Sequence, residues 1–181
     1  MLPQRKPLRL KGYDYNTMGA YFVTVCAADR KNLFGCVVGT GVLTRPQTEH
    51  GPTVQLTSYG TVVDKYIRQL HAFYEHISVD HYTIMPNHIH LLLSVSADGR
   101  VGRPGGRVGR PVPTAAAAKM SMVAQFVATL KRFSNKECGR QLWQARFHDH
   151  IIRDGADYER HANYILENPL RWELDELYIP Y

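Results

Sequence analysis

The sequence has few of the features that mark secreted, membrane or zinc-binding proteins. Cysteine occurs three times in 181 residues, and no pair of cysteines has the Cys-x-x-Cys spacing. This odd, scattered set predicts neither a disulfide framework nor a zinc site with cysteine ligands, and it is typical of a protein of the reducing cytoplasm. The N-terminal segment lacks the apolar stretch of a signal peptide, and no run of about 18 apolar residues predicts a membrane span. The three cysteines are Cys26, Cys36 and Cys138.

Acidic residues are scarce in two parts of the chain. The net charge is +6, from 22 Lys and Arg against 16 Asp and Glu. No acid lies between Arg5 and Lys11, and basic residues cluster again from Lys131 to Arg153, whereas acids are frequent from Asp154 to Glu176. This asymmetry favours a surface for an anionic partner, of which nucleic acid is the commonest, although a solvated helix surface gives the same pattern.

Two segments are poor in the residues that build a core. The stretch 97–118 contains the repeated motif Gly-Arg-Val-Gly-Arg-Pro, and this composition predicts a flexible insertion. The segment Gly35–Thr57, rich in Gly, Thr and Pro, is predicted to be a loop. Because 44% of all residues are hydrophobic, the remainder can bury a core, and the length predicts a single domain over residues 1–181.

Hydrophobic periodicity predicts the order β-α-β-β-α-β-α. The first helix is expected to begin at Thr57 or Ser58, and the second to end at Gly139. Asp154 is expected to cap the last helix, which must end before Pro169. The first six elements match a ferredoxin-like split βαβ fold of the α+β class, an antiparallel sheet with helices on one face. The predicted strands are 20–27, 77–85, 88–95 and 147–153, and the first two helices contain the apolar residues of 62–73 and 120–133.

Two histidines begin the third predicted strand. His88 and His90 are separated by Ile89, so they point to the same face of the strand. Two neutral imidazoles at this spacing can hold one divalent ion, although one such histidine can equally be a core or surface residue. A site of two histidines is incomplete and needs at least one more ligand.

The last predicted helix offers further polar groups on one face. Tyr164 and Asn168 lie four residues apart, and Asp157 and His161 belong to the same stripe. The chain contains 11 tyrosines, however, and a tyrosine on a helix is commonly a packing residue. Periodicity alone does not separate Tyr164 from the others.

Three motifs in order resemble a known family. Thr83–Leu92 resembles the HUH motif, two histidines around a bulky apolar residue, of the small single-tyrosine transposases. The blocks Leu142–Asp154 and Asp157–Trp172 resemble two further segments of that family. Together they are similar to the REP-associated tyrosine transposases, and the similarity extends from about Lys11 to Trp172, interrupted by the two segments that are poor in core residues.

The resemblance implies a role for each matching residue. His88 and His90 match the metal-binding pair, Tyr164 matches the nucleophile, and Asn168 falls where the family has a polar metal ligand. The implied cofactor is Mg²⁺ or Mn²⁺, because such an ion neutralises the scissile phosphate, whereas a free phenol is a poor nucleophile at neutral pH. The candidate DNA-binding residues are Arg9, Lys11, Lys131, Arg132, Arg146, His150 and Arg153.

The expected function is cleavage and rejoining of single-stranded DNA, next to hairpins of repetitive palindromes, through a covalent 5′-phosphotyrosine and a free 3′-hydroxyl. The expected partner is single-stranded or hairpin DNA in the bacterial cytoplasm, at the nucleoid, and both a homodimer and a monomer are consistent with the sequence. Two alternatives remain open. One is a replication-initiator or relaxase-like nickase with the same HUH site, and the other is a catalytically silent protein that binds DNA hairpins.

Overall fold

The structure is a computed structural model of the chain, and it describes residues 18–39, 53–96 and 120–180. Its centre is a four-stranded antiparallel sheet with the strand order β4-β5-β1-β6. This order is that of the ferredoxin-like split βαβ arrangement, so the predicted fold class is confirmed. The strands are β1 (Gly19–Cys26), β4 (Ile77–Met85), β5 (His88–Val95) and β6 (His148–Ile151).

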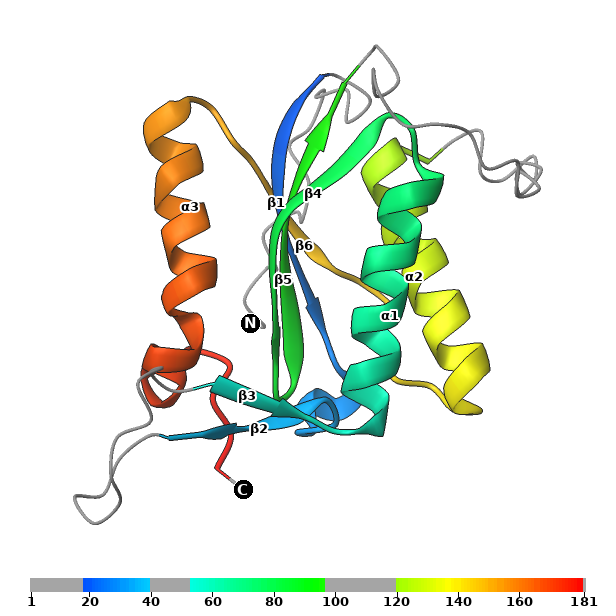
Figure 1. Cartoon of the computed structure of the whole chain (residues 1–181), viewed down its shortest axis with the longest axis vertical. Coiled ribbons are helices and arrows are strands. Elements are labelled where there is room, and N and C mark those ends of the chain that lie inside the picture. The colour runs from blue at the N-terminus through cyan, green and yellow to red at the C-terminus, as the bar shows by residue number, and fades with distance from the viewer. Residues whose placement is uncertain (1–17, 40–52, 97–119, 181) are drawn as a thin grey trace, which may run out of the picture.

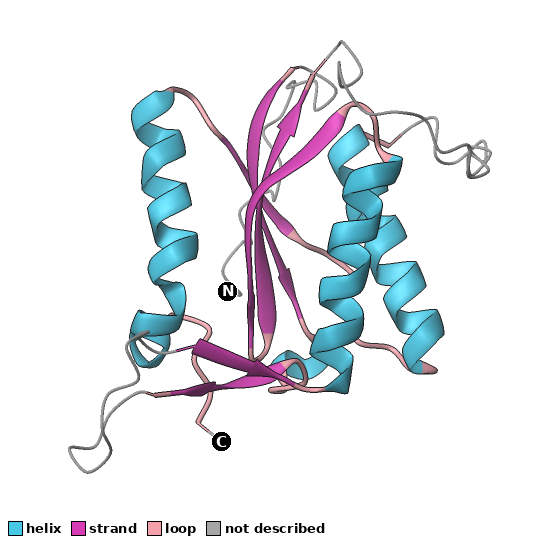
Figure 2. Cartoon of the chain, in the orientation of Figure 1, coloured by secondary structure: helices cyan, strands magenta, loops and turns pink. Residues whose placement is uncertain are grey.

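Three helices cover the two faces of the sheet. Helices α1 (Ser58–Phe73) and α2 (Met122–Cys138) lie side by side on one face, and α3 (Gly155–Glu167) lies on the opposite face (Figures 1 and 2). The predicted arrangement, with two helices on one face and a separate C-terminal helix, is thus observed. In the described ranges, no helix combines the length and the apolar character needed to cross a membrane.

The helices begin and end at the predicted signals. Oγ1 of Thr57 accepts a hydrogen bond from the backbone N of Gly60 at 3.2 Å, and Oδ1 of Asp154 accepts one from the backbone N of Asp157 at 2.8 Å. Each bond satisfies an N–H group that has no partner within its helix. Helix α2 ends at Gly139, whose φ of 64° lies in the left-handed region that glycine adopts without strain.

Strand β5 is buried on both faces. Leu91 and Leu93 belong to the main core between the sheet and helices α1 and α2. Leu92 points the other way and packs with Ala162 and Ile165 of α3 in a second, smaller core. Successive side chains of a strand alternate between its faces, which explains why a strand covered on both sides carries an uninterrupted apolar run.

The prediction of a loop over the whole of Gly35–Thr57 is wrong at both ends. Strands β2 (Gly35–Val38) and β3 (Thr53–Leu56) pair in an antiparallel ladder beside the turn between β4 and β5. Each has only four residues, too few for an alternating pattern to stand out from the Gly- and Pro-containing sequence around it. The predicted insertion 97–118 lies outside the described residues.

Gly60 lies where the start of α1 meets the chain before β2. A Cβ atom at this position would lie 2.0 Å from the carbonyl oxygen of Phe34. We therefore expect Gly60→Ala to lower the free energy of unfolding by roughly 1–3 kcal/mol, the usual cost of overpacking, as measured by urea denaturation. Gly155→Ala is the matched control, because nothing lies within 4 Å of a Cβ there. Equal denaturation midpoints for the two variants would show that this close approach is absent.

Candidate functional site

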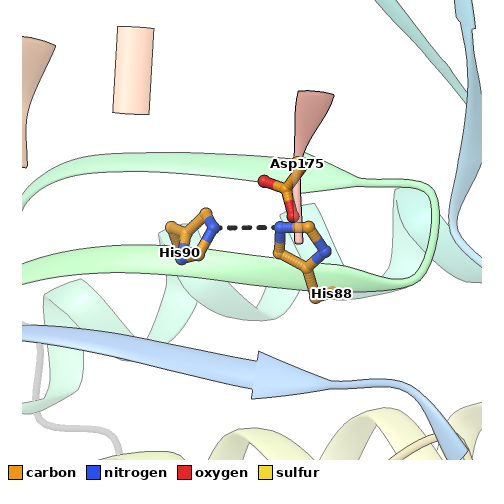
Figure 3. A group of neighbouring side chains, drawn as sticks. All are labelled: His88, His90 and Asp175. Carbon is orange, nitrogen blue, oxygen red and sulfur yellow. Dashed lines mark hydrogen bonds between the residues drawn. The ribbon is translucent and has the colours of Figure 1, made fainter. Parts of the chain in front are cut away.

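The two histidines of β5 face helix α3. His88 pairs with Cys26 of β1 and Met85 of β4, so it lies on a central strand of the sheet, at the end next to the β4–β5 turn. His88 and His90 share a strand face with Leu92, which packs against α3. Both imidazoles are buried, and their Nε2 atoms lie 2.9 Å apart (Figure 3).

Polar neighbours hold both imidazole rings. Nδ1 of His88 lies 2.8 Å from Oδ1 of Asn87, whose Nδ2 donates to the carbonyl oxygen of Leu177 at 2.7 Å. Because the amide nitrogen is used by Leu177, the amide oxygen faces His88. This assigns the ring hydrogen of His88 to Nδ1 and leaves a lone pair on Nε2. Nδ1 of His90 lies 2.9 Å from Oγ1 of Thr24.

Burial determines the charge of the pair. It lowers the pKa of His88 to about 4 and holds the pKa of His90 well below its usual value, with the neighbouring imidazole His88 as a second cause for His90. Both rings are therefore neutral near pH 7, the form in which imidazole coordinates metal ions.

A carboxylate from the C-terminal segment lies beside the two histidines. Asp175 follows the short helix η3 (Asn168–Leu174). The potential ligand atoms of His88, His90 and Asp175 all lie within 4.8 Å of one another, so these three groups could hold a metal ion. In Figure 3, Asp175 lies next to His88 and is contributed by a different part of the chain.

Asp175 also connects the residues that the sequence analysis selected on the last helix. Its Oδ2 accepts hydrogen bonds from the hydroxyl of Tyr164 and from Nδ2 of Asn168, each at 3.1 Å. Its Oδ1 accepts from the backbone N of Leu177 at 2.7 Å. Oδ1 of Asn168 is buried and has no hydrogen-bond partner among the described residues.

Tyr164 lies over the histidine pair and is partly exposed. Its ring centroid is 5.2 Å from that of His90 and 5.9 Å from that of Phe22, and 41% of the residue is accessible to solvent. Burial of its hydroxyl and the nearby carboxylate of Asp175 raise the pKa of Tyr164 to about 12. The free phenol is consequently protonated at neutral pH.

These groups open into a cavity of about 560 Å³. His90, Tyr164 and Asp175 line it, together with Glu176 and several basic side chains. A concave site with a few convergent polar groups is typical of ligand-binding sites. The basic lining residues are Arg30, His148, Arg160 and His161.

A second group of ionisable side chains lies next to the cavity. Asp157 is 6% exposed, and its Oδ2 accepts hydrogen bonds from Nε2 of His150 at 2.8 Å and from the backbone N of Arg153 at 3.1 Å. The hydrogen bond from His150 is the largest of the effects that lower the pKa of Asp157 to about 2. The potential ligand atoms of His150, Asp157 and His161 again lie within 4.8 Å of one another.

The candidate DNA-binding residues do not form one group. Nζ of Lys131 points into the protein and donates to the carbonyl oxygens of Gln144, Ala145 and Arg146 at 2.8–3.3 Å. Burial lowers the pKa of Lys131 to about 8. Arg132, Arg146 and Arg153 are exposed, His150 is bonded to Asp157, and Arg9 and Lys11 lie outside the described residues.

Sequence reasoning selected His88, His90, Tyr164 and Asn168, and all four lie in or beside one pocket. It did not select Asp175, because a single acid in an acidic tail carries no local pattern. It did not select Asn87 either, although the position of Asn87 directly before the HUH histidines was the available signal for its contact with His88.

The contact between Tyr164 and Asp175 can be tested without measuring any activity, through the pKa of Tyr164. Asp175→Asn removes the charge that contributes to the raised pKa of Tyr164, while burial, the largest cause, remains. We expect the pKa of Tyr164 to fall below about 12 yet stay above its ordinary value.

NMR titration of protein labelled at the tyrosine Cζ, in EDTA and with Tyr164→Phe for assignment, measures this shift. Glu176→Gln is the matched control, since that carboxylate is the smallest of the causes and should give a smaller fall. An unchanged pKa in Asp175→Asn would contradict the described contact.

The chain was compared with known protein families and known proteins. The chain matches no protein-family model. An uncharacterized protein of Haemophilus influenzae is 28% identical over 180 residues, which cover 97% of this chain and 93% of that protein. A second protein of the same organism, named "Putative REP-associated tyrosine transposase", is 28% identical over 118 residues, 59% of this chain and 60% of that protein.

Among solved structures, a REP-associated tyrosine transposase bound to a REP hairpin has a similar fold. The TM-score is 0.55 at 18% sequence identity, over 90% of this chain and 74% of that one. The shared fold and the sequence similarity agree with the motifs found in the sequence. The resemblance of this chain to the REP-associated tyrosine transposases is therefore confirmed.

Proposed function

We propose that this protein cleaves and rejoins single-stranded DNA next to hairpins, with Tyr164 as the nucleophile and a divalent metal ion bound at His88 and His90. The observation that carries the proposal is the convergence of a tyrosine hydroxyl, two neutral imidazoles and the amide of Asn168 beside one cavity. The hairpin bound to the protein of similar fold supports a DNA hairpin as the substrate of this chain.

The residues present fit a divalent ion. Two nitrogens bound to one ion at roughly 2.1 Å each and at right angles lie about 3 Å apart, and the Nε2 atoms of His88 and His90 are separated by 2.9 Å. The buried oxygen of Asn168 has no hydrogen-bond partner among the described residues, so its lone pairs are available to bind an ion. His88, His90 and Asn168 would therefore hold Mg²⁺ or Mn²⁺, with the negative charge of Asp175 alongside.

The protein's own groups provide the remaining chemistry. The oxygen of Tyr164 attacks phosphorus, the bond from phosphorus to the 3′-oxygen breaks, and a 5′-phosphotyrosine forms. Oδ2 of Asp175 already accepts the hydrogen bond from this hydroxyl, so it is the nearest acceptor for the tyrosine proton. A bound ion would neutralise charge on the scissile phosphate. The covalent phosphotyrosine conserves the bond energy needed for rejoining.

One chain supplies every residue of this proposed site. The strand histidines and the helix tyrosine come together through the packing of α3 on the sheet. This supports a site that is complete within a single chain, whether the protein is a monomer or a homodimer. The exposed residues Arg132, Arg146 and Arg153 are available for phosphate contacts that add affinity without sequence specificity.

The metal site is tested first by binding. We expect His88→Ala or His90→Ala to weaken Mn²⁺ binding by more than the roughly 10–100-fold loss that is typical for outer-shell partners, as measured by isothermal titration calorimetry. DNA cleavage should be lost in both variants and in EDTA, while hairpin binding persists, because phosphate contacts supply most of the affinity.

His148→Ala is the control, because His148 lines the same cavity but belongs to neither histidine cluster. Undiminished Mn²⁺ binding by both strand variants would rule out the proposed metal site.

Tyr164→Phe tests the nucleophile. The change removes one hydroxyl, so the stability should change by no more than roughly 1 kcal/mol, the net worth of one hydrogen bond. Strand cleavage and the covalent adduct should vanish, whereas Mn²⁺ and hairpin binding should remain. Mass spectrometry of the adduct trapped with the unmodified protein should place the nucleotide on Tyr164.

Tyr158→Phe is the matched control, since this tyrosine lies on the same helix but bonds to Asp80. An adduct on Tyr158, or cleavage by Tyr164→Phe, would refute the assignment of the nucleophile. A protein that binds the hairpin and never forms an adduct would instead be a silent binding protein.

A further inference from the structure

We propose that His161 is the general acid of the cleavage step, which delivers a proton from Nε2 to the departing 3′-oxygen, and that Asp157 positions its ring. This inference rests on the function proposed above, because the leaving oxygen exists only if Tyr164 attacks the phosphorus. It assigns a role to a cluster of side chains that the metal site and the nucleophile do not use.

His161 lies on the side of α3 that faces the cavity. It lies one helical turn before Tyr164, and both side chains line the same cavity. The ring of Phe22 is in contact with both, at 4.7 Å from His161 and 5.9 Å from Tyr164 between centroids, and it also stacks on His90 at 5.0 Å. His161 is therefore separated from the metal-binding histidines by one aromatic ring.

The hydrogen bonds of His161 fix which nitrogen faces the cavity. Its Nδ1 lies 2.8 Å from the backbone oxygen of Asp157 and 3.3 Å from its Oδ1. Both partners are acceptors, so Nδ1 carries a hydrogen. Nε2 makes no hydrogen bond to any residue in the described part of the chain, and it is the nitrogen left to exchange a proton with a bound substrate.

The surroundings hold the ring of His161 in this orientation. The side chain of Asp157 is 9% exposed and is held by hydrogen bonds from His150, the backbone of Arg153 and the guanidinium of Arg160. The ring of His150 stacks on that of His161 at 4.7 Å with an interplanar angle of 20°. A histidine held by an acceptor at one nitrogen, here the backbone oxygen of Asp157 with its carboxylate nearby, and free at the other can transfer protons in acid–base catalysis.

The other groups of the cavity suit this role less well. Arg30 and Arg160 line the cavity, but a guanidinium does not release its proton in a protein. His90 is occupied by Thr24 and His88. The exposed side chain of His148 has no carboxylate partner among the residues that the structure describes.

The proton balance of the step is complete. A new bond forms between the oxygen of Tyr164 and phosphorus, and the bond from phosphorus to the 3′-oxygen breaks, with its electron pair left on that oxygen. The proton of Tyr164 goes to Asp175, and the 3′-oxygen takes its proton from Nε2 of His161. Rejoining reverses both transfers, so no oxidant, reductant or further reactant is needed.

A substrate with sulfur in place of the bridging 3′-oxygen separates acid catalysis from every other role, because a thiolate leaves without being protonated. In single-turnover cleavage of hairpin DNA, His161→Ala should react at least about 100-fold more slowly than the unmodified protein on the oxygen substrate, yet within about fivefold of it on the 3′-sulfur substrate. Asp157→Asn should show a smaller defect with the same rescue, as expected of a positioning residue.

Three controls accompany this experiment. Tyr164→Phe should be inactive on both substrates, and His76→Ala, at an exposed histidine that does not line the cavity, should be unaffected on both. Thermal unfolding followed by circular dichroism verifies that each variant is folded. His161→Gln provides a second variant if His161→Ala is unstable, because an amide can keep a hydrogen bond to Asp157 but cannot act as the acid.

The outcomes are distinguishable. Selective rescue of His161→Ala, or of His161→Gln in its place, by the sulfur substrate supports the proposal. Full activity on the oxygen substrate, or an equal loss on both substrates, overturns the acid role while leaving Tyr164 as the nucleophile. Absence of any covalent adduct with the unmodified protein on either substrate refutes the proposed function itself.

Discussion

The burial of β5 on both of its faces is the constraint on which the rest of the structure depends. This strand lies between β4 and β1, so its backbone groups are paired on both edges. One row of its side chains fills the main core beneath α1 and α2, and the other row faces α3. Because Leu92 anchors that second row against α3, the two histidines of the row are held beneath the same helix. The packing that stabilises the sheet thus also orients the candidate site.

The C-terminal segment after α3 completes the polar environment of the buried histidines. Burying a polar group costs free energy unless it is hydrogen-bonded. The carbonyl of Leu177 holds the amide of Asn87, and this amide holds His88. Asp175 accepts hydrogen bonds from both Tyr164 and Asn168. The segment that contains Asp175 and Leu177 is distant in sequence from β5, yet it supplies hydrogen-bond partners to the β4–β5 turn and to α3. The site therefore depends on the packing of this segment against the sheet and α3.

Charge is distributed unevenly around the cavity. The histidine pair is neutral because it is buried, and Tyr164 is protonated because burial and Asp175 oppose its ionisation. Arginine and histidine side chains also line the cavity, and Asp157 bonds to two of them, Arg160 and His161. This combination of neutral, acidic and basic groups is the physical basis of the proposed phosphoryl chemistry.

The sequence by itself determined the order of the main helices and strands. It also determined which side chains a few residues apart lie on the same face of a strand or helix. The alternation of side chains along a strand placed His88 and His90 on one face, and helix periodicity placed Tyr164 and Asn168 on one stripe, since both effects act over a few residues. The caps at Thr57, Gly139 and Asp154 were readable for the same reason.

Contacts between segments that are distant in the sequence were determined only by the tertiary structure. It placed Asp175 beside the histidines, turned Lys131 inward onto backbone carbonyls, and joined His150 to Asp157 and His161. It also paired two four-residue strands, β2 and β3, across a Gly- and Pro-containing segment. None of these contacts leaves a periodic signal in the sequence, because each arises from the packing of elements that only the folded chain brings together.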